Sequence, residues 1–328
     1  MKKIKKLAVY FLCLIIVTGC ISGCGGFAGK SDEELLISSI ANLNKAKSFG
    51  TNVKLTGKLS AKIDGETEDE ILDIEVSSTQ FMEPARAKIV IRESSAEAAA
   101  DEESYVQEED GEYVIYTKVS GIWTKRSQGE LEAAVESAGG VNFIHEVLSE
   151  DVSKYIRKED RAEGDKRYLV YEYKIENKNL KSFIKDMMSA VGASLEADEL
   201  EAVTRRVSDI VMTVLIDRKE ECISSIEMPL ADVMNNVLRA VMEYTIQEAA
   251  DSPDEEEVTS YLDQFKIEVS DDTKMVARYS AIDAAEDFTI PKEALEAKSE
   301  EDLESMDEDE RESMMDEGAD NTEDEDKE

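Results

Sequence analysis

The chain has 328 residues and carries 76 Asp and Glu against 38 Lys and Arg, with a single His, so its formal net charge is -38. A surface this acidic repels phosphate groups, which excludes nucleic acid as a partner. Catalysis that depends on several histidines is excluded as well. Hydrophobic residues make up 41% of the chain, which is sufficient for a packed core.

The N-terminus predicts export and lipid attachment. Four lysines precede an apolar run of 11 residues, 7–17, whereas a membrane-spanning helix needs about 20. A short apolar run with positive flanks is typical of a cleavable signal. Two lipobox-like sequences follow, one ending at Cys20 and the other at Cys24. We therefore predict a signal peptide over residues 1–19 or 1–23, lipid attachment at Cys20 or Cys24, and a flexible tether over 20–30. This places the protein at the extracytoplasmic face of the cell membrane.

The first half of the body predicts one helix followed by strands. Ser31 and Glu34 have the spacing of a capping box, and helical periodicity continues from there to about Gly50. Apolar and polar residues then alternate through 52–63, which indicates a strand with one buried face. Similar alternation predicts strands over 72–76, 85–91 and 113–123, with a loop or short helix over 94–104.

The second half mixes helices and strands. Helical periodicity predicts helices over 131–138, 141–148, 180–191 and 234–242. Alternating or continuous apolar runs predict strands over 169–175, 207–217, 222–228, 261–269 and 275–281. About nine or ten strands, mostly joined in sequence, predict a single α+β domain over residues 31–298 with a large, curved antiparallel sheet.

The C-terminus predicts an acidic tail. Residues 299–328 contain 17 Asp and Glu and only two basic residues. Such a self-repelling segment cannot bury enough apolar surface to order itself, so we expect it to be disordered.

The order of these features resembles a known family. The lipobox, the sequence Lys45-Ala46-Lys47-Ser48-Phe49, a tyrosine-rich hairpin leading to Trp123, the turn after Ile216-Asp217, and the terminal Ile290-Pro291-Lys292-Glu293-Ala294 occur in that order. This order is similar to that of uncharacterised Gram-positive lipoproteins related to the LppX/LprG and LolA-like lipoproteins. The resemblance spans about residues 20–298. It implies an open half-barrel whose helices lie against the concave face of the sheet and whose apolar hollow holds a lipid. Helices at 178–203 and 231–250 and the acidic tail depart from that picture, because these segments could fill the hollow with protein.

The sequence offers no catalytic centre. His145 lacks the second histidine of a zinc motif, and we expect it to lie on or near a helix surface. Cys222 is expected to be a small buried hydrophobe; pairing with Cys24 is the alternative if Cys20 carries the lipid. Acidic pairs are too numerous for any one of them to indicate a glycosidase. We therefore expect a non-enzymatic protein without metal or cofactor.

The methionines point toward an apolar ligand. Six of the twelve methionines lie within residues 187–242, and flexible thioethers adapt to varied apolar partners; plain core packing is the competing explanation. The candidate ligand-binding residues are Phe183, Met187, Met188, Met234, Leu238, Val241 and Met242.

Two functional hypotheses follow. The first is a membrane-anchored lipoprotein that binds or carries a lipid or other hydrophobic ligand, with neutral or cationic lipids favoured over anionic ones by the acidic charge. The second is a tethered structural, interaction or sensor module with a filled core, whose acidic face meets a basic protein. An open apolar cavity beneath the helices would favour the first, and a sheet packed solid against its helices would favour the second.

Overall fold

The structure, a computed structural model, describes residues 30–63, 66–93, 102–119, 121–129, 135, 148, 151–190, 196–249, 265–299 and 302. The predicted signal peptide, both candidate lipidation cysteines and nearly all of the acidic tail lie outside these residues, as do His145 and most of the predicted helices over 131–148. Within the described part, no helix is long and apolar enough to cross a membrane.

Strands dominate the described chain. They are β1 (Ser48–Ile63), β2 (Glu66–Met82), β3 (Ala85–Glu93), β4 (Glu102–Glu109), β5 (Glu112–Val119), β6 (Ile122–Gln128), β7 (Tyr155–Glu163), β8 (Lys166–Ile175), β9 (Ile210–Asp217), β10 (Cys222–Pro229), β11 (Phe265–Val269), β12 (Lys274–Ser280) and β13 (Lys298–Ser299). The helices are α2 (Asp32–Lys45), α5 (Lys181–Ala190), α6 (Ala197–Arg206), α7 (Ala231–Ala249) and α9 (Lys292–Leu295), with short 3-10 turns η1 (Val152–Lys154) and η2 (Asn177–Leu180).

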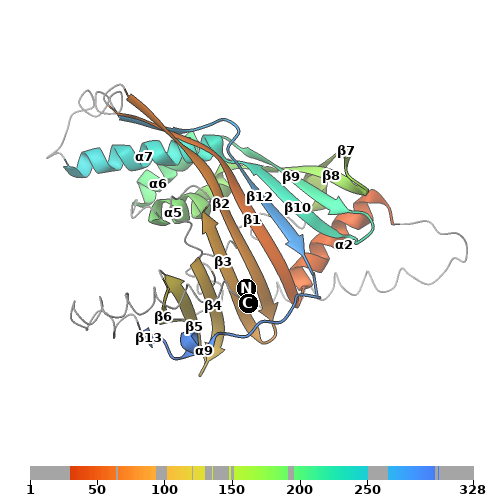
Figure 1. The fold of residues 1–328 in the computed structure, drawn as a ribbon. Coiled ribbons are helices and arrows are strands. Elements are labelled where there is room, and N and C mark those ends of the chain that lie inside the picture. Colours follow the sequence, from red (N-terminus) through yellow and green to blue (C-terminus); the bar gives the residue numbers. More distant parts are fainter. Residues whose placement is uncertain are drawn as a thin grey trace, which may run out of the picture. The chain divides into compact units, whose positions relative to one another are not determined.

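All of these strands belong to one open sheet, which Figure 1 shows with the helices at its ends. The order is β13-β6-β5-β4-β3-β2-β1-β12-β10-β9-β8-β7, and β11 pairs with the far half of β1. Every pairing is antiparallel except that of β13 with β6. The predicted α+β fold with a large antiparallel sheet is therefore confirmed.

Strand β1 organises the centre of this sheet. It pairs with β2 along its whole length, with β12 over its first half and with β11 over its second half. Gly57 of β1 lies opposite the connection between β11 and β12, and a Cβ atom there would lie 2.3 Å from the Thr273 Oγ1 atom. The absence of a side chain at Gly57 therefore gives the buried Thr273 its place beside the strand.

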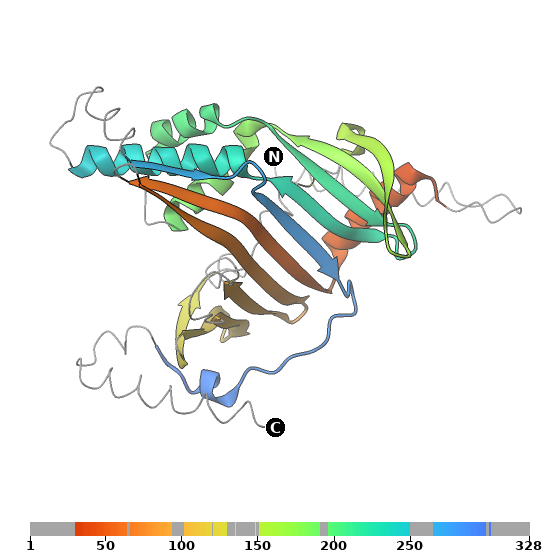
Figure 2. The same cartoon turned by 45° about the horizontal axis from the view of Figure 1, so that its top comes forward.

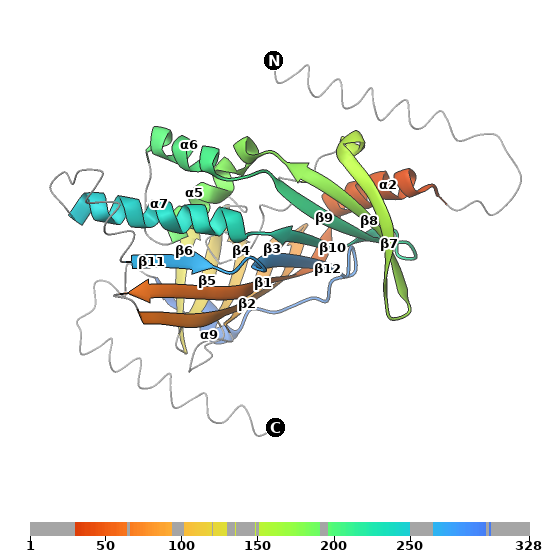
Figure 3. The same cartoon turned by 90° about the horizontal axis from the view of Figure 1, so that it is seen from above.

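The inner face of the sheet carries two apolar clusters. The main cluster joins β1, β12 and β7–β10 to side chains from α2, α5, α6 and α7. Figures 2 and 3 show α7 beside β11 and α2 against β9 and β10, in agreement with their contacts. The second cluster consists of Ala87, Ile89, Val106, Ile115 and Val135. Helices therefore cover the β7–β10 side of the inner face, as the family resemblance implied.

The outer face is covered by the C-terminal segment. Tyr105, Val114 and Tyr116 pack there against Ala294, with Phe288 and Ile290 at the edge of the cluster. Arg86 lies between two rings, 4.6 Å from the centre of the Phe81 ring and 5.0 Å from that of Phe288. These contacts fix the chain up to β13. The terminal Ile290–Ala294 sequence thus closes the sheet from outside.

Three strands, β4, β7 and β13, lie outside every predicted strand, and the predicted strand over 113–123 is two strands, β5 and β6, so the expected count of nine or ten was too low. Strand β4 begins inside the expected 94–104 loop, and β7 was not anticipated at all. Both are rich in charge, so few of their residues show apolar alternation. In β4 only Ser104, Tyr105 and Val106 are buried, and in β7 only Tyr155 is buried. The hydrogen bonds of neighbouring strands, rather than local hydrophobicity, hold these segments extended.

Candidate ligand-binding site

Helix α7 presents two parallel apolar stripes. Val233, Val237 and Ala240 form the first stripe and are buried in the main cluster. The second stripe consists of Met234, Leu238 and Met242 at intervals of four, and these side chains are only half-buried. Helical geometry places the two stripes side by side on the helix. α7 therefore carries a half-exposed apolar surface next to the part that packs into the core.

Hydrogen bonds fix the rotation of α7. The Asn235 amide brackets Val269 of β11: the Val269 N–H donates to Asn235 Oδ1 over 2.7 Å, and Asn235 Nδ2 donates to the Val269 carbonyl over 3.1 Å. At the start of the helix, the N–H of Leu230 donates to the carbonyl of Thr273 over 3.0 Å. These bonds hold α7 to the strand beside it, so the direction of the half-exposed stripe is set by the fold.

The predicted residues of α5 and α7 reach the same apolar cluster where the structure describes them. Phe183 of α5 and Met234 of α7 are half-buried and both pack against the main cluster. Leu238 and Met242 are half-buried on α7. The backbones of Met187, Met188 and Val241 belong to these helices, while their side chains lie outside the described part. Phe183 and Met234 therefore border the same cluster, and the helices that carry them, α5 and α7, contact each other.

A matching apolar strip lies on the inner face of the sheet. Leu55 and Ile74 are register partners, as are Val53 and Val76, and Val76 pairs in turn with Ile91 of β3. All of them except Val53 are half-buried. Val76 packs against both the main and the second cluster. We define the inner apolar strip as Leu55, Leu72, Ile74, Val76 and Ile91. Alternation along β1–β3 indicates that these residues face inward, but only the neighbouring elements decide how much of each stays exposed.

Protein fills the other side of the inner face. Leu36, Ile40 and Leu43 of α2 are buried in the main cluster together with strand residues such as Met212 and Ile223. Leu180 and Ile184 are likewise fully buried. Over β8–β10 the hollow expected from the family resemblance is therefore occupied by the helices of the chain itself.

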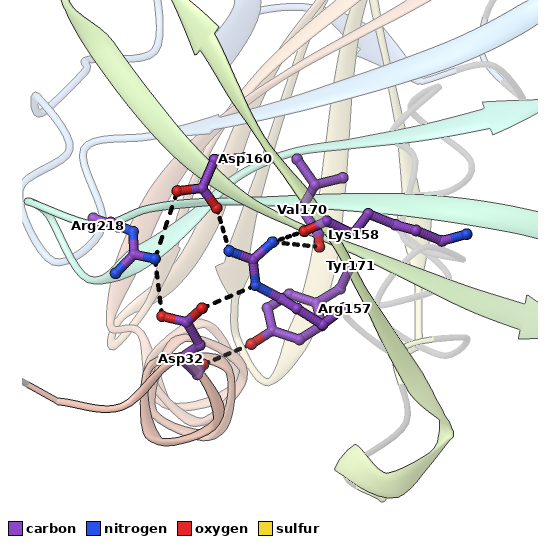
Figure 4. Close-up of polar contacts among 7 residues, drawn as sticks. All are labelled: Asp32, Arg157, Lys158, Asp160, Val170, Tyr171 and Arg218. Atoms are coloured by element: carbon purple, nitrogen blue, oxygen red, sulfur yellow. Dashed lines mark hydrogen bonds and ion pairs between the residues drawn. The ribbon is translucent and has the colours of Figure 1, made fainter.

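A polar cluster joins the first turn of α2 to the strands (Figure 4). Asp32 pairs with Arg157 of β7 over 3.0 Å and with Arg218 of the β9–β10 turn over 2.9 Å. Asp160 pairs with the same two arginines, at 3.6 Å for Arg218. The Tyr171 hydroxyl donates to the Asp32 carbonyl over 2.8 Å. Two carboxylates and two guanidinium groups thus alternate around one ring.

This cluster is a structural clamp. The hydrogen bond from Arg157 lowers the pKa of Asp160, so its carboxylate stays ionised at neutral pH. Burial raises the pKa of Tyr171, and the charge of Asp32 raises it further. Neither Asp160 nor Tyr171 is therefore poised to exchange a proton near neutral pH. The cluster fixes the start of α2, the point at which the predicted tether would join the domain.

Cys222 is a half-buried free thiol on β10. Burial raises its pKa, and the nearby carboxylates of Asp217 and Glu220 raise it further. A thiol held protonated is a poor nucleophile. Among the residues that the structure describes, no group of three or more His, Cys, Asp or Glu side chains is arranged to hold a metal ion.

These features define an open-sheet protein with helices packed on one side of its inner face. The model of a family of unknown function, DUF6612, matches residues 31–252, and the chain belongs to this family. A search of curated proteins gave no match.

Solved structures give further similarities. LprF from Mycobacterium bovis matches with a TM-score of 0.40 and 9% identity, covering 80% of this chain and 96% of LprF. A DUF1329 family protein from Desulfovibrio piger has a TM-score of 0.22 and 9% identity, covering 78% of this chain and 93% of its own. A domain described as an outer membrane lipoprotein-sorting protein, from Vibrio parahaemolyticus, has a TM-score of 0.20 and 10% identity, covering 75% and 89%.

Proposed function

We propose that the protein is a lipid-anchored, extracytoplasmic lipoprotein that performs no reaction and binds a lipid or other hydrophobic ligand on the inner face of its sheet. The supporting observation is the pair of half-exposed apolar surfaces. One is the stripe of Met234, Leu238 and Met242 on α7, with Phe183 on the neighbouring helix α5, and the other is the inner apolar strip of β1–β3. Leu55 and Val76 of the strip pack against the same cluster as Phe183 and Met234.

The energetic argument is the cost of leaving these surfaces in water. Burial of apolar area stabilises a complex by about 25 cal/mol per Å². An acyl chain that covered roughly 200 Å² of this surface would gain about 5 kcal/mol before the entropy of immobilisation is subtracted. Over β1–β3, a ligand of this kind would cover the inner face as the helices cover it over β7–β10.

The anchor is proposed from the sequence. A lipidated Cys20 or Cys24 would attach the chain to the membrane through a tether of about ten residues, which could reach about 35 Å when extended. Because α2 begins at Asp32 and is clamped to β7 and the β9–β10 turn, the tether would join the domain at this clamp. The proposed partner is therefore the membrane itself, which is also the source of the ligand.

A filled interaction module is the second candidate. It is favoured by α2, α5, α6 and α7, whose side chains occupy the inner face over β7–β10. It is also favoured by the first residues of β2, where Glu66, Glu68, Asp69 and Glu70 are all exposed. In this case the acidic surface would meet a basic protein, and no lipid would enter.

Photo-crosslinking in the membrane tests the lipid proposal. Cells that express the full chain are fed a fatty acid with a photoactivatable group and an affinity handle, irradiated, and the labelled peptides are mapped. We expect label on the α7 peptide and on β2, separate from any label on the anchor peptide. Leu238→Glu should remove the α7 label, because a buried carboxylate opposes an acyl chain.

Ile71→Glu is the matched control. Ile71 is 70% exposed and lies on β2, one residue from Leu72 of the inner apolar strip and therefore on the opposite face. This variant should keep the α7 label. If α7 of the folded wild-type protein is labelled no more than background, the lipid proposal is contradicted and the interaction module is the remaining candidate.

A further inference from the structure

The two faces of the central sheet carry opposite charge. Side chains alternate between the faces along a strand, and register partners share a face. On β1–β6 and β12, ten Lys and Arg and six Asp and Glu point outward, whereas one Arg and six Glu point inward. The outward basic residues come three each from β1 and β3, two from β12, and one each from β5 and β6. A chain with a net charge of -38 therefore has a net positive outer face on its central sheet.

Ion pairs within the sheet neutralise part of this positive charge. Lys54, Lys58 and Lys88 are each bound to an acidic residue of the neighbouring strand. Lys274 and Arg278 of β12 are exposed, and no ion pair among the described residues holds either of them. Positive charge on this face is therefore available to an anionic group from outside the sheet.

The chain itself already lays an acidic segment across this face. We define the C-terminal strap as residues 281–299, which contain five Asp and Glu and two Lys. Asp283 of the strap accepts a hydrogen bond from the Lys47 N–H over 2.6 Å, and Asp287 pairs with Arg86 of β3 over 2.5 Å. Helix α9 of the strap contacts β5 and β6. Acidic side chains thus help to bind the strap to the outer face.

The strap brings the start of the acidic tail to the edge of this face. β13 pairs with β6 and places Ser299 opposite Lys125 (Figure 1). The Asp302 N–H donates to Ser299 Oγ over 3.0 Å. Hydrogen bonds from Ser299 lower the pKa of Asp302, and the charges of Lys125 and Lys298 lower it further. This acid of the tail therefore already lies in the field of an outward lysine.

The rest of the tail has the charge and the length to cover the face. Residues 303–328 contain 14 Asp and Glu and two basic residues. These 26 residues span at most about 90 Å, and a flexible chain of this length averages roughly 30 Å from end to end. β12 lies six strands from β6 in the sheet, which is about 29 Å at the usual strand spacing. The tail is therefore long enough to reach Lys274 and Arg278.

Other anionic occupants are at a disadvantage. An anionic membrane would have to approach a chain whose net charge is -38, and a second copy would present the same positive face. The tail is joined covalently to the strap, which gives it an effective concentration on the order of millimolar at this face. Individually weak charge pairs are then sufficient for binding.

We propose that the acidic tail, residues 303–328, folds back from β13, binds the basic outer face of β1–β6 and β12, and so closes this face to other anionic groups. The tail is then an intramolecular partner of the sheet. This inference goes beyond the proposed lipid binding, because it concerns the opposite face of the sheet.

The test follows energy transfer from Trp123, the one tryptophan of the chain, to a dansyl group attached after Glu328. Trp123 borders the outer-face cluster, so transfer is efficient when the tail lies over this face. The full chain is measured in a nonionic detergent while salt is raised from about 0.01 M to 1 M, which shortens the screening length from about 30 Å to about 3 Å. Each value is normalised to the unlabelled chain.

The sign of the salt effect separates a bound tail from a free one. Salt releases a bound tail, so the transfer efficiency should fall several-fold between the two salt concentrations. A free tail of like charges is extended by its own repulsion and contracts when salt screens that repulsion, so its transfer efficiency would rise.

Two double variants form a matched pair. Lys274→Gln with Arg278→Gln removes two exposed charges from the outward side of β12, and Lys166→Gln with Lys219→Gln removes two from the start of β8 and from the β9–β10 turn. The β12 variant should lower the transfer efficiency at low salt and reduce its fall with salt. The control variant should change neither. Circular dichroism confirms that both are folded.

Three outcomes would overturn the proposal. A rise of transfer with salt in the wild type shows a free tail. An equal effect of the two double variants shows general charge attraction rather than binding to the outer face. Loss of transfer when phosphatidylglycerol is added to the detergent micelles at constant salt makes anionic lipid, not the tail, the occupant of the face. Each of these readouts is independent of whether the inner face binds a lipid.

Discussion

The packing of α2 against the inner face provides a quantitative test of the fold. Leu36 is 1% exposed and belongs to the main cluster, whereas the next residue, Ile37, is 48% exposed. Replacing a buried leucine with alanine removes buried methyl groups and leaves a cavity, at a cost of about 3 kcal/mol. Ile37→Ala loses about 1 kcal/mol of partial burial and regains about 0.4 kcal/mol, because alanine favours the helix more than isoleucine does.

The free energies of unfolding of the two variants should therefore differ by roughly 2 kcal/mol. For a domain of this size, about 3 kcal/mol lowers the Tm by roughly 6 °C, and the Ile37→Ala change by about 1 °C. Urea unfolding of each variant is followed by circular dichroism and by the fluorescence of Trp123, the one tryptophan of the chain. Trp123 packs on the outer face, away from the main cluster, so coincident transitions would also support the proposed single domain.

The result that refutes this reasoning is equal destabilisation by Leu36→Ala and Ile37→Ala. α2 would then not fill the inner face, and the hollow over β8–β10 would be open. If Leu36→Ala shifts the unfolding transition followed by circular dichroism but not the one followed by Trp123 fluorescence, the main cluster and the outer-face cluster around Trp123 unfold separately.

Three further predictions concern single sites. Gly57→Ala should destabilise the domain by about 1–3 kcal/mol through contact with Thr273, and Thr273→Ala should restore most of the loss in urea unfolding; no rescue would contradict the contact. Because Arg157 lowers the pKa of Asp160, the pair stabilises the fold above about pH 4 and less so as pH falls through the lowered pKa; Asp160→Asn should flatten this part of the stability profile, and an unchanged profile would exclude the pair as its source. Because burial raises the pKa of Cys222, the folded protein should be alkylated at Cys222 several-fold more slowly at pH 8 than glutathione is. The extent of alkylation is read from the Cys222 peptide after the reaction is stopped and the protein digested; equal rates would show an accessible thiolate.

The distribution of filled and half-exposed surface bears directly on the choice between the two functions. Helices occupy the inner face over β7–β10, as an interaction module would require. The inner apolar strip and the second stripe of α7, Met234, Leu238 and Met242, remain half-exposed.

Several elements could be read directly from local periodicity. The alternation through 52–63 predicted β1, and the spacing of Leu180, Phe183 and Ile184 predicted α5. These signals are local because a strand repeats every two residues and a helix every 3.6. The same reasoning selected Phe183 and Met234, which the structure places against one cluster. It could not separate Val237, which is buried, from Leu238, which is half-exposed, because both are apolar.

Other features depend on residues that are distant in the sequence. β12 inserts between β1 and β10, although more than 200 residues separate it from β1. Five hydroxyl side chains share one face of the sheet only because the registers of β1 to β6 align them, although their spacing along the chain shows no period: Thr51, Ser78, Ser104, Thr117 and Thr124. The charged strand β4 is extended because β3 and β5 supply its hydrogen bonds on both sides.

The sequence by itself therefore predicted a compartment for the protein and determined its acidity and most of its helices and strands, because each of these is encoded in composition or in short-range periodicity. The tertiary structure decided the strand order, the side of the sheet that the helices fill, and the apolar and hydroxyl side chains that meet on the inner face. These depend on register and on packing between distant segments, and a one-residue shift of register would move every such side chain to the opposite face.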